Sequence, residues 1–162
     1  MLGLDLPTIL REISIIAVPG ILAITLHEVA HGWVARLFGD QTAAERGRLS
    51  LHPLRHVDPI GTVLVPTTLL LATGGQIGFG WAKPVPVDKN RLRRPRRDMV
   101  AVALAGPASN LLMASVWAAL GALTVSTVGY EGAVGGWLAV VCFFGIWINA
   151  LLAAFNLLTI PP

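Results

Sequence analysis

The sequence is poor in cysteine and in charged residues. Its single cysteine, Cys142, excludes an internal disulfide bond. Only 13% of the 162 residues are charged and 54% are hydrophobic, whereas a water-soluble domain of this length needs more charge to cover its surface. The composition therefore predicts an integral membrane protein that lies in a lipid bilayer and forms a single domain over residues 1–162.

The N-terminus also lacks a basic cluster ahead of its first apolar run, which argues against a cleaved signal peptide. Long apolar runs predict membrane spans at residues 13–38, 99–125 and 137–158. A shorter apolar stretch at residues 60–72 contains Pro66, and it fits a re-entrant or interfacial segment better than a span. The predicted fold is an α-helical membrane protein with three core transmembrane helices.

Positive charge is concentrated in one part of the chain. All of the twelve lysines and arginines except Arg11 lie within residues 36–97, and residues 126–136 contain none. The positive-inside rule therefore places the basic loops at 39–98 in the cytoplasm. A net charge of +3 would also suit a nucleic-acid partner. However, the basic run at 89–97 flanks an apolar span, which indicates a surface facing anionic lipid and no nucleic acid.

The first predicted span contains an H-E-x-x-H motif made by His27, Glu28 and His31. On a helix the two histidines are one turn apart, so both imidazoles can bind one metal ion. Glu28 lies beside that face and is a candidate catalytic base. Two histidines without a chemical role are the alternative. In lipid, however, ionisable groups are costly without a function, and Arg36 is the only other ionisable residue in 13–38. The motif predicts a metalloprotease.

Asn110 and Asn156 are polar residues inside the second and third predicted spans. They are candidate substrate-binding residues, because an amide can steady a substrate backbone or a tetrahedral intermediate. The alternative is hydrogen bonding between helices, which asparagine often provides in lipid. Asn149 lies one heptad before Asn156 on the same helix face, and we expect it to serve such packing.

Two segments between the first two long spans have weak strand patterns. Residues 48–52 alternate between polar and apolar side chains. Residues 77–87 alternate at first and then become proline-rich, which favours an exposed edge over a central strand. An exposed edge can hold a substrate in extended form by β-addition. A structural hairpin that caps the site is the alternative.

Taken together, these segments resemble the site-2 proteases, zinc metalloproteases that cut within the membrane, and especially their small bacterial members. Besides H-E-x-x-H, the matching motifs are GD at 39–40, GRL at 47–49, HVDPIG at 56–61, GWAKPVPV at 80–87, AGPASN at 105–110 and FNLLTIPP at 155–162. The resemblance implies a three-helix core with a small β-structured loop between the first two helices, located in the bacterial inner membrane. It also implies one zinc ion bound by His27 and His31, Glu28 as the base, and regulated cleavage of single-span membrane proteins.

Three positions depart from the family pattern. Thr159 stands where the family has proline, and His52 stands where it has asparagine. The third zinc ligand of the family is an aspartate in a Leu-Asp-Gly motif after the Pro-Pro pair, and this sequence ends at Pro162. A catalytic zinc usually has three protein ligands. We therefore predict a C-terminally shortened chain that binds zinc weakly and hydrolyses peptides poorly.

Two other functional classes stay open from the sequence. A non-catalytic membrane binding module of the same fold would need no third ligand. A metal or proton transporter would use the histidines as pathway ligands, but transporters usually carry ionisable residues in several spans. In this sequence only the first predicted span, residues 13–38, carries such ionisable residues. No pattern in the sequence predicts the oligomeric state.

Overall fold

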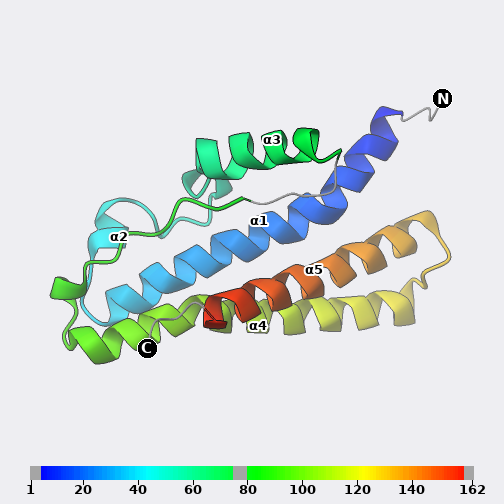
Figure 1. Ribbon diagram of the computed structural model, residues 1–162. Coiled ribbons are helices and arrows are strands. Elements are labelled where there is room, and N and C mark those ends of the chain that lie inside the picture. Colours follow the sequence, from blue (N-terminus) through cyan, green and yellow to red (C-terminus); the bar gives the residue numbers. More distant parts are fainter. Residues whose placement is uncertain (1–4, 75–79, 159–162) are drawn as a thin grey trace. The chain divides into compact units, whose positions relative to one another are not determined.

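The computed structural model describes residues 5–74 and 80–158. Three helices in this part are long and apolar enough to cross a membrane: α1 (Leu6–Leu37), α4 (Pro95–Thr127) and α5 (Ala133–Leu158) (Figure 1). The three predicted spans are thus confirmed as helices. Each helix begins several residues earlier than its apolar run.

The early start of α1 has a local cause. Asp5 precedes the helix, and its Oδ1 accepts a hydrogen bond from Thr8 N at 3.0 Å. This contact satisfies one of the backbone N–H groups that a helix N-terminus leaves unpaired. Pro7 suits the first turn, where its missing N–H costs nothing. Hydropathy alone does not detect such a start, because the capping residues are polar.

The early start of α4 is explained in the same way. Asp98 Oδ2 accepts a hydrogen bond from Arg94 N at 2.7 Å, so a carboxylate in the first turn reaches back to the residue before the helix. Pro95 occupies the first helical position, which its fixed φ favours. The helix then includes three charged residues ahead of its apolar part, Arg96, Arg97 and Asp98.

The chain divides into two compact units, residues 1–27 with 103–162, and residues 28–102. In the first unit, α4 and α5 run antiparallel and side by side (Figure 1). A Cβ atom on Gly145 would lie only 2.4 Å from ring atoms of Trp117, so glycine permits this close approach.

The second unit contains the C-terminal part of α1 and several short helices. These are α2 (Thr42–Glu45), η1 (Pro53–Arg55), η2 (Pro59–Leu64), α3 (Val65–Ala72) and η3 (Lys89–Arg91). The π-helix η2 and the helix α3 have six and eight residues. At about 1.5 Å per residue they are too short to cross a hydrocarbon core of about 30 Å. A re-entrant or interfacial position for this segment stays a prediction.

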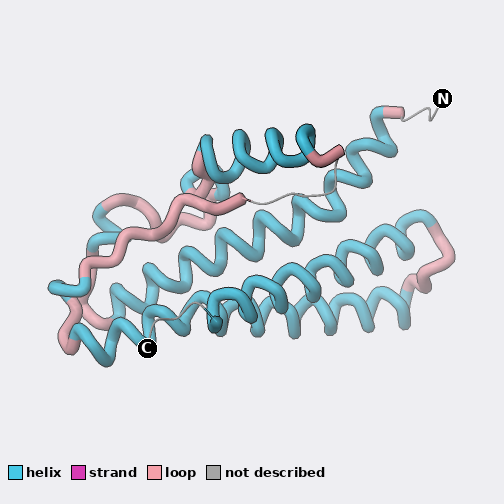
Figure 2. Tube along the Cα trace, viewed as in Figure 1, coloured by secondary structure: helices cyan, strands magenta, loops and turns pink. Residues whose placement is uncertain are grey.

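The predicted small β-structured loop is wrong for the residues that the structure describes. None of residues 5–74 or 80–158 lies in a strand (Figure 2). Residues 48–52 form a turn followed by irregular chain, and residues 80–87 are irregular. The part of the predicted edge at 77–79 lies outside the described residues.

The reason lies in where the backbone of residues 80–87 finds its hydrogen bonds. Three N–H groups donate to acceptors that form no ladder: Trp81 N to Gly61 O at 3.0 Å, Lys83 N to His56 O at 2.9 Å, and Val85 N to Glu28 Oε2 at 2.7 Å. The prolines at 84 and 86 have no N–H to donate. A strand partner is therefore replaced by single contacts to separate elements.

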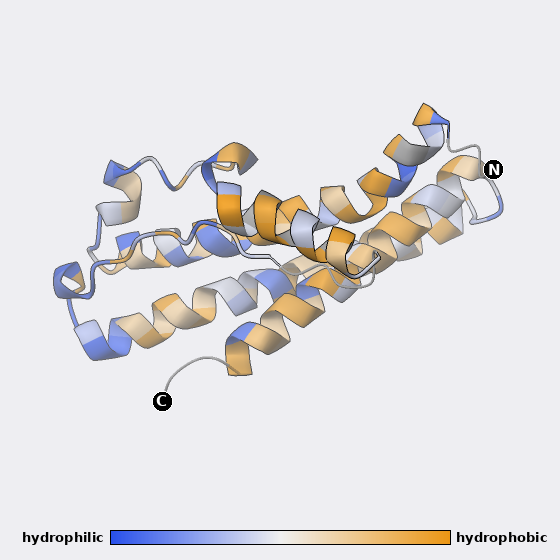
Figure 3. Cartoon of the chain, turned by 45° about the horizontal axis from the view of Figure 1, so that its top comes forward, coloured by the Kyte–Doolittle hydropathy of each residue, from blue (hydrophilic) through white to orange (hydrophobic). Residues whose placement is uncertain are grey.

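Polar side chains are rare in α5, whose most apolar part has a mean hydropathy of 2.3. In Figure 3 most of this helix is coloured as hydrophobic, with a few pale or blue positions. Asn149 is nevertheless fully buried in it, and Asn156 is half-buried near its end. In an apolar helix, a buried amide needs hydrogen-bond partners, because water cannot supply them.

Candidate metal centre

The H-E-x-x-H motif lies inside α1, which continues unbroken through it. His27 and His31 are four residues apart, so on a helix their Cβ atoms are about 5–6 Å apart on one face. The boundary between the two units falls directly after His27. Asn110, which contacts His27, belongs to the first unit, and Val85 and Val102, which contact Glu28 and His31, belong to the second.

His27 is buried, with 7% of its surface exposed, and its Nδ1 is hydrogen-bonded to Asn110 Oδ1 on α4. The Asn110 amide nitrogen donates to Asn149 Oδ1 at 2.8 Å and to Ala23 O at 3.4 Å. Because two oxygen acceptors meet the amide nitrogen, the amide oxygen faces His27 and must accept. His27 Nδ1 therefore carries a proton, and in the neutral ring the lone pair lies on Nε2.

His31 reaches the same tautomer by a different contact. Its Nδ1 lies 2.7 Å from Val102 O, and a carbonyl oxygen can only accept. Pro107 in the same helix supplies no N–H, and the carbonyl that thereby lacks its helical donor is that of Ala103, the residue after Val102. A ring N–H that donates to an oxygen while the other nitrogen is left to bind metal is the usual arrangement around zinc.

Glu28 is held by a hydrogen bond from the irregular segment of residues 80–87. Its Oε2 accepts a hydrogen bond from Val85 N at 2.7 Å. Gly32, one turn further along α1, gives this segment room. A Cβ atom there would lie 3.0 Å from Val85 Cγ1 and 2.6 Å from Leu49 Cδ2. The candidate base is thus oriented by a backbone N–H rather than by another charged side chain.

Arg48 also holds the segment of residues 80–87, through hydrogen bonds to its backbone carbonyls. The guanidinium is buried, with 8% of the residue exposed, and it donates to three backbone carbonyls. Its Nη2 lies 2.5 Å from Lys83 O and 3.3 Å from Pro84 O, and its Nη1 donates to Arg55 O. A buried cation is costly unless its donors are used. Arg48 therefore fixes the backbone directly before Val85.

Asp40 holds Asp88, the residue that directly follows the segment of residues 80–87. It is fully buried, and its carboxylate accepts hydrogen bonds from Thr42 N at 2.9 Å, from Thr42 Oγ1 at 2.5 Å and from Asp88 N at 2.7 Å. Burial raises the pKa of Asp40, but these hydrogen bonds and the charge of Arg91 together outweigh it. The pKa therefore lies below its ordinary value of 3.8. Asp40 thus joins the end of α1 to Asp88.

The donor chemistry of the motif fits zinc, although the number of ligands is incomplete. Two neutral imidazoles with Nε2 lone pairs are typical zinc ligands. Among the residues that the structure describes, no group of three or more histidine, cysteine, aspartate or glutamate side chains gathers to hold a metal ion. His27 and His31 as ligands therefore stay a prediction, and the described part of the chain supplies no third one.

The two asparagines predicted to bind substrate have different surroundings. Asn110 is fully buried and contacts His27 and Asn149. Asn156 is half-buried, and its Nδ2 donates to Leu152 O at 2.8 Å. Their contact with substrate stays a prediction.

Sequence reasoning missed the role of Val85, because a backbone N–H leaves no trace in residue type. It also missed the roles of Arg48 and Asp40 in holding the segment around Val85. The two family-like motifs that contain them, GRL and GD, were the available signal.

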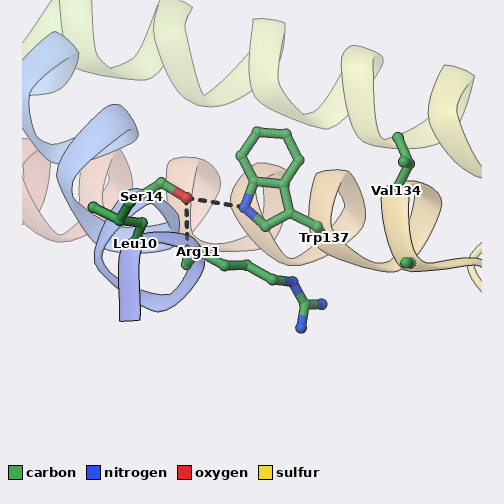
Figure 4. A pocket seen from close by; sticks show the side chains of 6 residues that line it. Leu10, Arg11, Ser14, Val134 and Trp137 are labelled. Atoms are coloured by element: carbon green, nitrogen blue, oxygen red, sulfur yellow. Dashed lines mark hydrogen bonds between the residues drawn. The ribbon is translucent and has the colours of Figure 1, made fainter. Parts of the chain in front are cut away.

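A surface pocket of about 410 Å³ lies elsewhere in the first unit (Figure 4). It is lined by Leu10, Arg11, Ser14, Ala133, Val134 and Trp137. In Figure 4, Trp137 Nε1 points to Ser14 Oγ, which it contacts at 3.0 Å. Ser14 precedes His27 by about 20 Å along α1. The pocket contains no candidate metal ligand and is not the site described above.

The chain is similar to proteins that are named as zinc metalloproteases. It is 43% identical over 144 residues to the Bacillus subtilis protein "Putative zinc metalloprotease YwhC", a match that covers 88% of this chain and 61% of that protein. Proteins named "Putative zinc metalloprotease Rip2" are 35% identical in Mycolicibacterium smegmatis and 38% identical in Mycobacterium tuberculosis, each over 94 residues. These matches cover 58% of this chain and 34% of each relative.

The chain thus spans about three fifths of the length of its Bacillus relative. No protein-family model and no solved structure matches it. The similarity supports the predicted protease function and, through the names of the relatives, zinc as its cofactor. The chain is therefore similar to proteins named as putative zinc metalloproteases, and the described residues include three helices long and apolar enough to span a membrane.

Proposed function

We propose that the chain is the core of a site-2-type intramembrane endopeptidase, which hydrolyses peptide bonds in or near the transmembrane segments of single-span proteins. The observation that carries this proposal is the pair of histidines on α1, each with Nδ1 bonded to an oxygen. In a neutral ring this contact leaves the lone pair on Nε2. The similarity to zinc metalloproteases supports the same chemistry. We place the protein in a bacterial inner membrane, with residues 39–98 in the cytoplasm.

The proposed chemistry assigns one task to each residue of the motif. His27 and His31 would hold a zinc ion, which when bound supplies Lewis acidity toward water and the substrate carbonyl. Glu28 takes the proton of the attacking water and delivers it to the leaving amine. Val85 N–H holds one oxygen of Glu28, so the carboxylate keeps one orientation during both transfers.

Substrate contacts are proposed for Asn110 and Asn156, although each amide already has a hydrogen-bond partner within the protein. The Asn110 amide contacts His27 and Asn149, so substrate binding would cost it those contacts. Pairing of substrate with residues 80–87 is also limited. At the alternate positions 82, 84 and 86, the two prolines offer no N–H. We therefore assign this segment to holding Glu28.

The 162-residue chain by itself should be a weak enzyme. Its described residues offer two zinc ligands, and catalytic zinc sites usually have three protein ligands. We infer that this chain binds zinc weakly and hydrolyses peptides poorly. A non-catalytic membrane binding module of the same fold is the second candidate, favoured because the described residues gather no third metal ligand.

The test compares this chain with the protein encoded by the complete reading frame that contains it. Both are placed in proteoliposomes with a single-span membrane protein that carries a tag at each end. We expect zinc-dependent cleavage by the complete protein, none by its Glu28→Gln variant, and little by the 162-residue chain. Absence of cleavage by the complete protein, with zinc bound, would favour the binding module. Cleavage that persists in Glu28→Gln would refute the role of Glu28.

A further inference from the structure

A polar chain of three side chains crosses the first unit where the helices are otherwise apolar. It begins at His27 on α1, passes through Asn110 on α4 and ends with Asn149 on α5. Asn110 and Asn149 are both fully buried. Polar groups this deep in an apolar bundle are costly unless each one is satisfied, so their directions are determined by their neighbours.

The direction of the chain follows from its last contact. Asn149 Nδ2 donates to Gly145 O at 2.8 Å, and a carbonyl oxygen can only accept. Asn149 therefore presents its oxygen to Asn110, at 2.8 Å, and Asn110 must present its NH₂ group. That choice turns the Asn110 oxygen toward His27, which then donates from Nδ1.

We infer that Asn149 is a positioning residue that acts on His27 through Asn110. By fixing which way the Asn110 amide points, it keeps the His27 proton on Nδ1 and the lone pair on Nε2. The value of this tautomer for metal binding rests on the proposed function, but the tautomer itself does not. Asn149 was expected only to help helices pack, so this is a second role for it.

The consequence of losing Asn149 follows from the same geometry. With leucine at 149, the Asn110 NH₂ group would keep only Ala23 O, at 3.4 Å, as an acceptor. The Asn110 amide could then turn over and offer its NH₂ group to His27 Nδ1, which would place the ring proton on Nε2. A histidine protonated at Nε2 cannot bind a metal ion through that atom. With a protonated aspartate at 149, the hydroxyl can donate to Gly145 O in place of Nδ2, the other oxygen still faces Asn110, and the original direction is kept.

The first readout needs no metal. The 162-residue chain is labelled with ¹⁵N in its histidine rings and placed in lipid nanodiscs, and the His27 signals are assigned with a His27→Gln variant. Magnetic resonance then distinguishes a protonated Nδ1 from a protonated Nε2. We expect Nδ1–H in the wild type and in Asn149→Asp, and a substantial Nε2–H population in Asn149→Leu.

The matched control is Ser14→Ala. It removes another hydrogen bond between α5 and α1, the one from Trp137 Nε1 to Ser14 Oγ, within the same unit. A general loosening of the helices would act in both variants, whereas the inferred role acts only at Asn149. We therefore expect the His27 tautomer of Ser14→Ala to match that of the wild type.

The second readout is zinc affinity of the complete protein. Loss of a partner behind a metal ligand typically weakens binding about 10–100-fold. We expect that loss in Asn149→Leu and recovery of most of the affinity in Asn149→Asp.

Several results would overturn the inference. They are Nε2–H in the wild type or in Asn149→Asp, an unchanged tautomer in folded Asn149→Leu, or equal shifts in Asn149→Leu and Ser14→Ala. If Asn149→Leu does not fold, Asn149→Ala removes the same oxygen acceptor and takes its place in this comparison. Failure of zinc binding with the tautomers as expected would contradict the proposed function and leave the role of Asn149 standing.

Discussion

Replacing Arg48 with methionine should release the segment that holds Glu28. Methionine keeps an unbranched apolar stem but is shorter, and the hydrogen bonds to the carbonyls of Arg55, Lys83 and Pro84 are lost. A hydrogen bond from a charged donor contributes about 1.5–3 kcal/mol, and relief of the buried charge offsets part of the sum. We expect the segment to lose about 2–4 kcal/mol of local stability.

Hydrogen exchange of the amides at Trp81, Lys83 and Val85 measures this loss, because each donates a hydrogen bond that opens when the segment detaches. A loss of 2 kcal/mol corresponds to about 30-fold faster exchange. The control is Arg55→Met. It removes an exposed contact to Gly47 O at 2.8 Å and keeps the carbonyl that Arg48 uses. Unchanged exchange in Arg48→Met, or equal acceleration in both variants, would refute the reasoning.

Three further predictions concern packing and charge. Gly32→Ala should push residues 80–87 away from α1 and lower the local stability of that segment by about 1–3 kcal/mol. The same hydrogen-exchange experiment measures this loss, and unchanged protection of these amides would contradict the prediction. Because the pKa of Asp40 is lower in the folded state, its contribution is present above its ordinary pKa of 3.8 and is lost as the pH falls through the lower folded value. Protection of Asp88 N, corrected for intrinsic exchange, should therefore fall in acid, and this dependence should weaken in Asp40→Asn. Gly145→Leu should separate α4 from α5 through Trp117 and lower the unfolding temperature, whereas Ser14→Ala should have a smaller effect.

The three long helices were predictable from sequence because lipid offers the backbone no hydrogen-bond partner. A long apolar run must therefore satisfy its own backbone as a helix. The starts of the helices were not predictable from hydropathy, since Asp5 and Asp98 act through capping contacts that lie outside the apolar runs. The motif on α1 was visible because its spacing is local.

The prediction of β structure failed because the backbone groups of this segment form hydrogen bonds with residues remote in sequence. Val85 N donates to Glu28, 57 residues away, and Lys83 O accepts from Arg48, 35 residues away. No local alternation of residue types reports such contacts. Asn149 was noticed for its place on a helix face, but its role depends on a partner 39 residues away and on the direction of an amide. Residue type identified the candidate groups, and the fold determined how they are oriented.

The central claim is that His27 and His31 bind one zinc ion through their Nε2 atoms. The most direct measurement is the X-ray absorption spectrum at the zinc edge of the complete protein, loaded with one equivalent of zinc. The account predicts two imidazole nitrogens at about 2.0–2.1 Å from the metal, and their loss when both histidines are replaced by alanine. A zinc shell without imidazole, or one that the double replacement leaves unchanged, would contradict it.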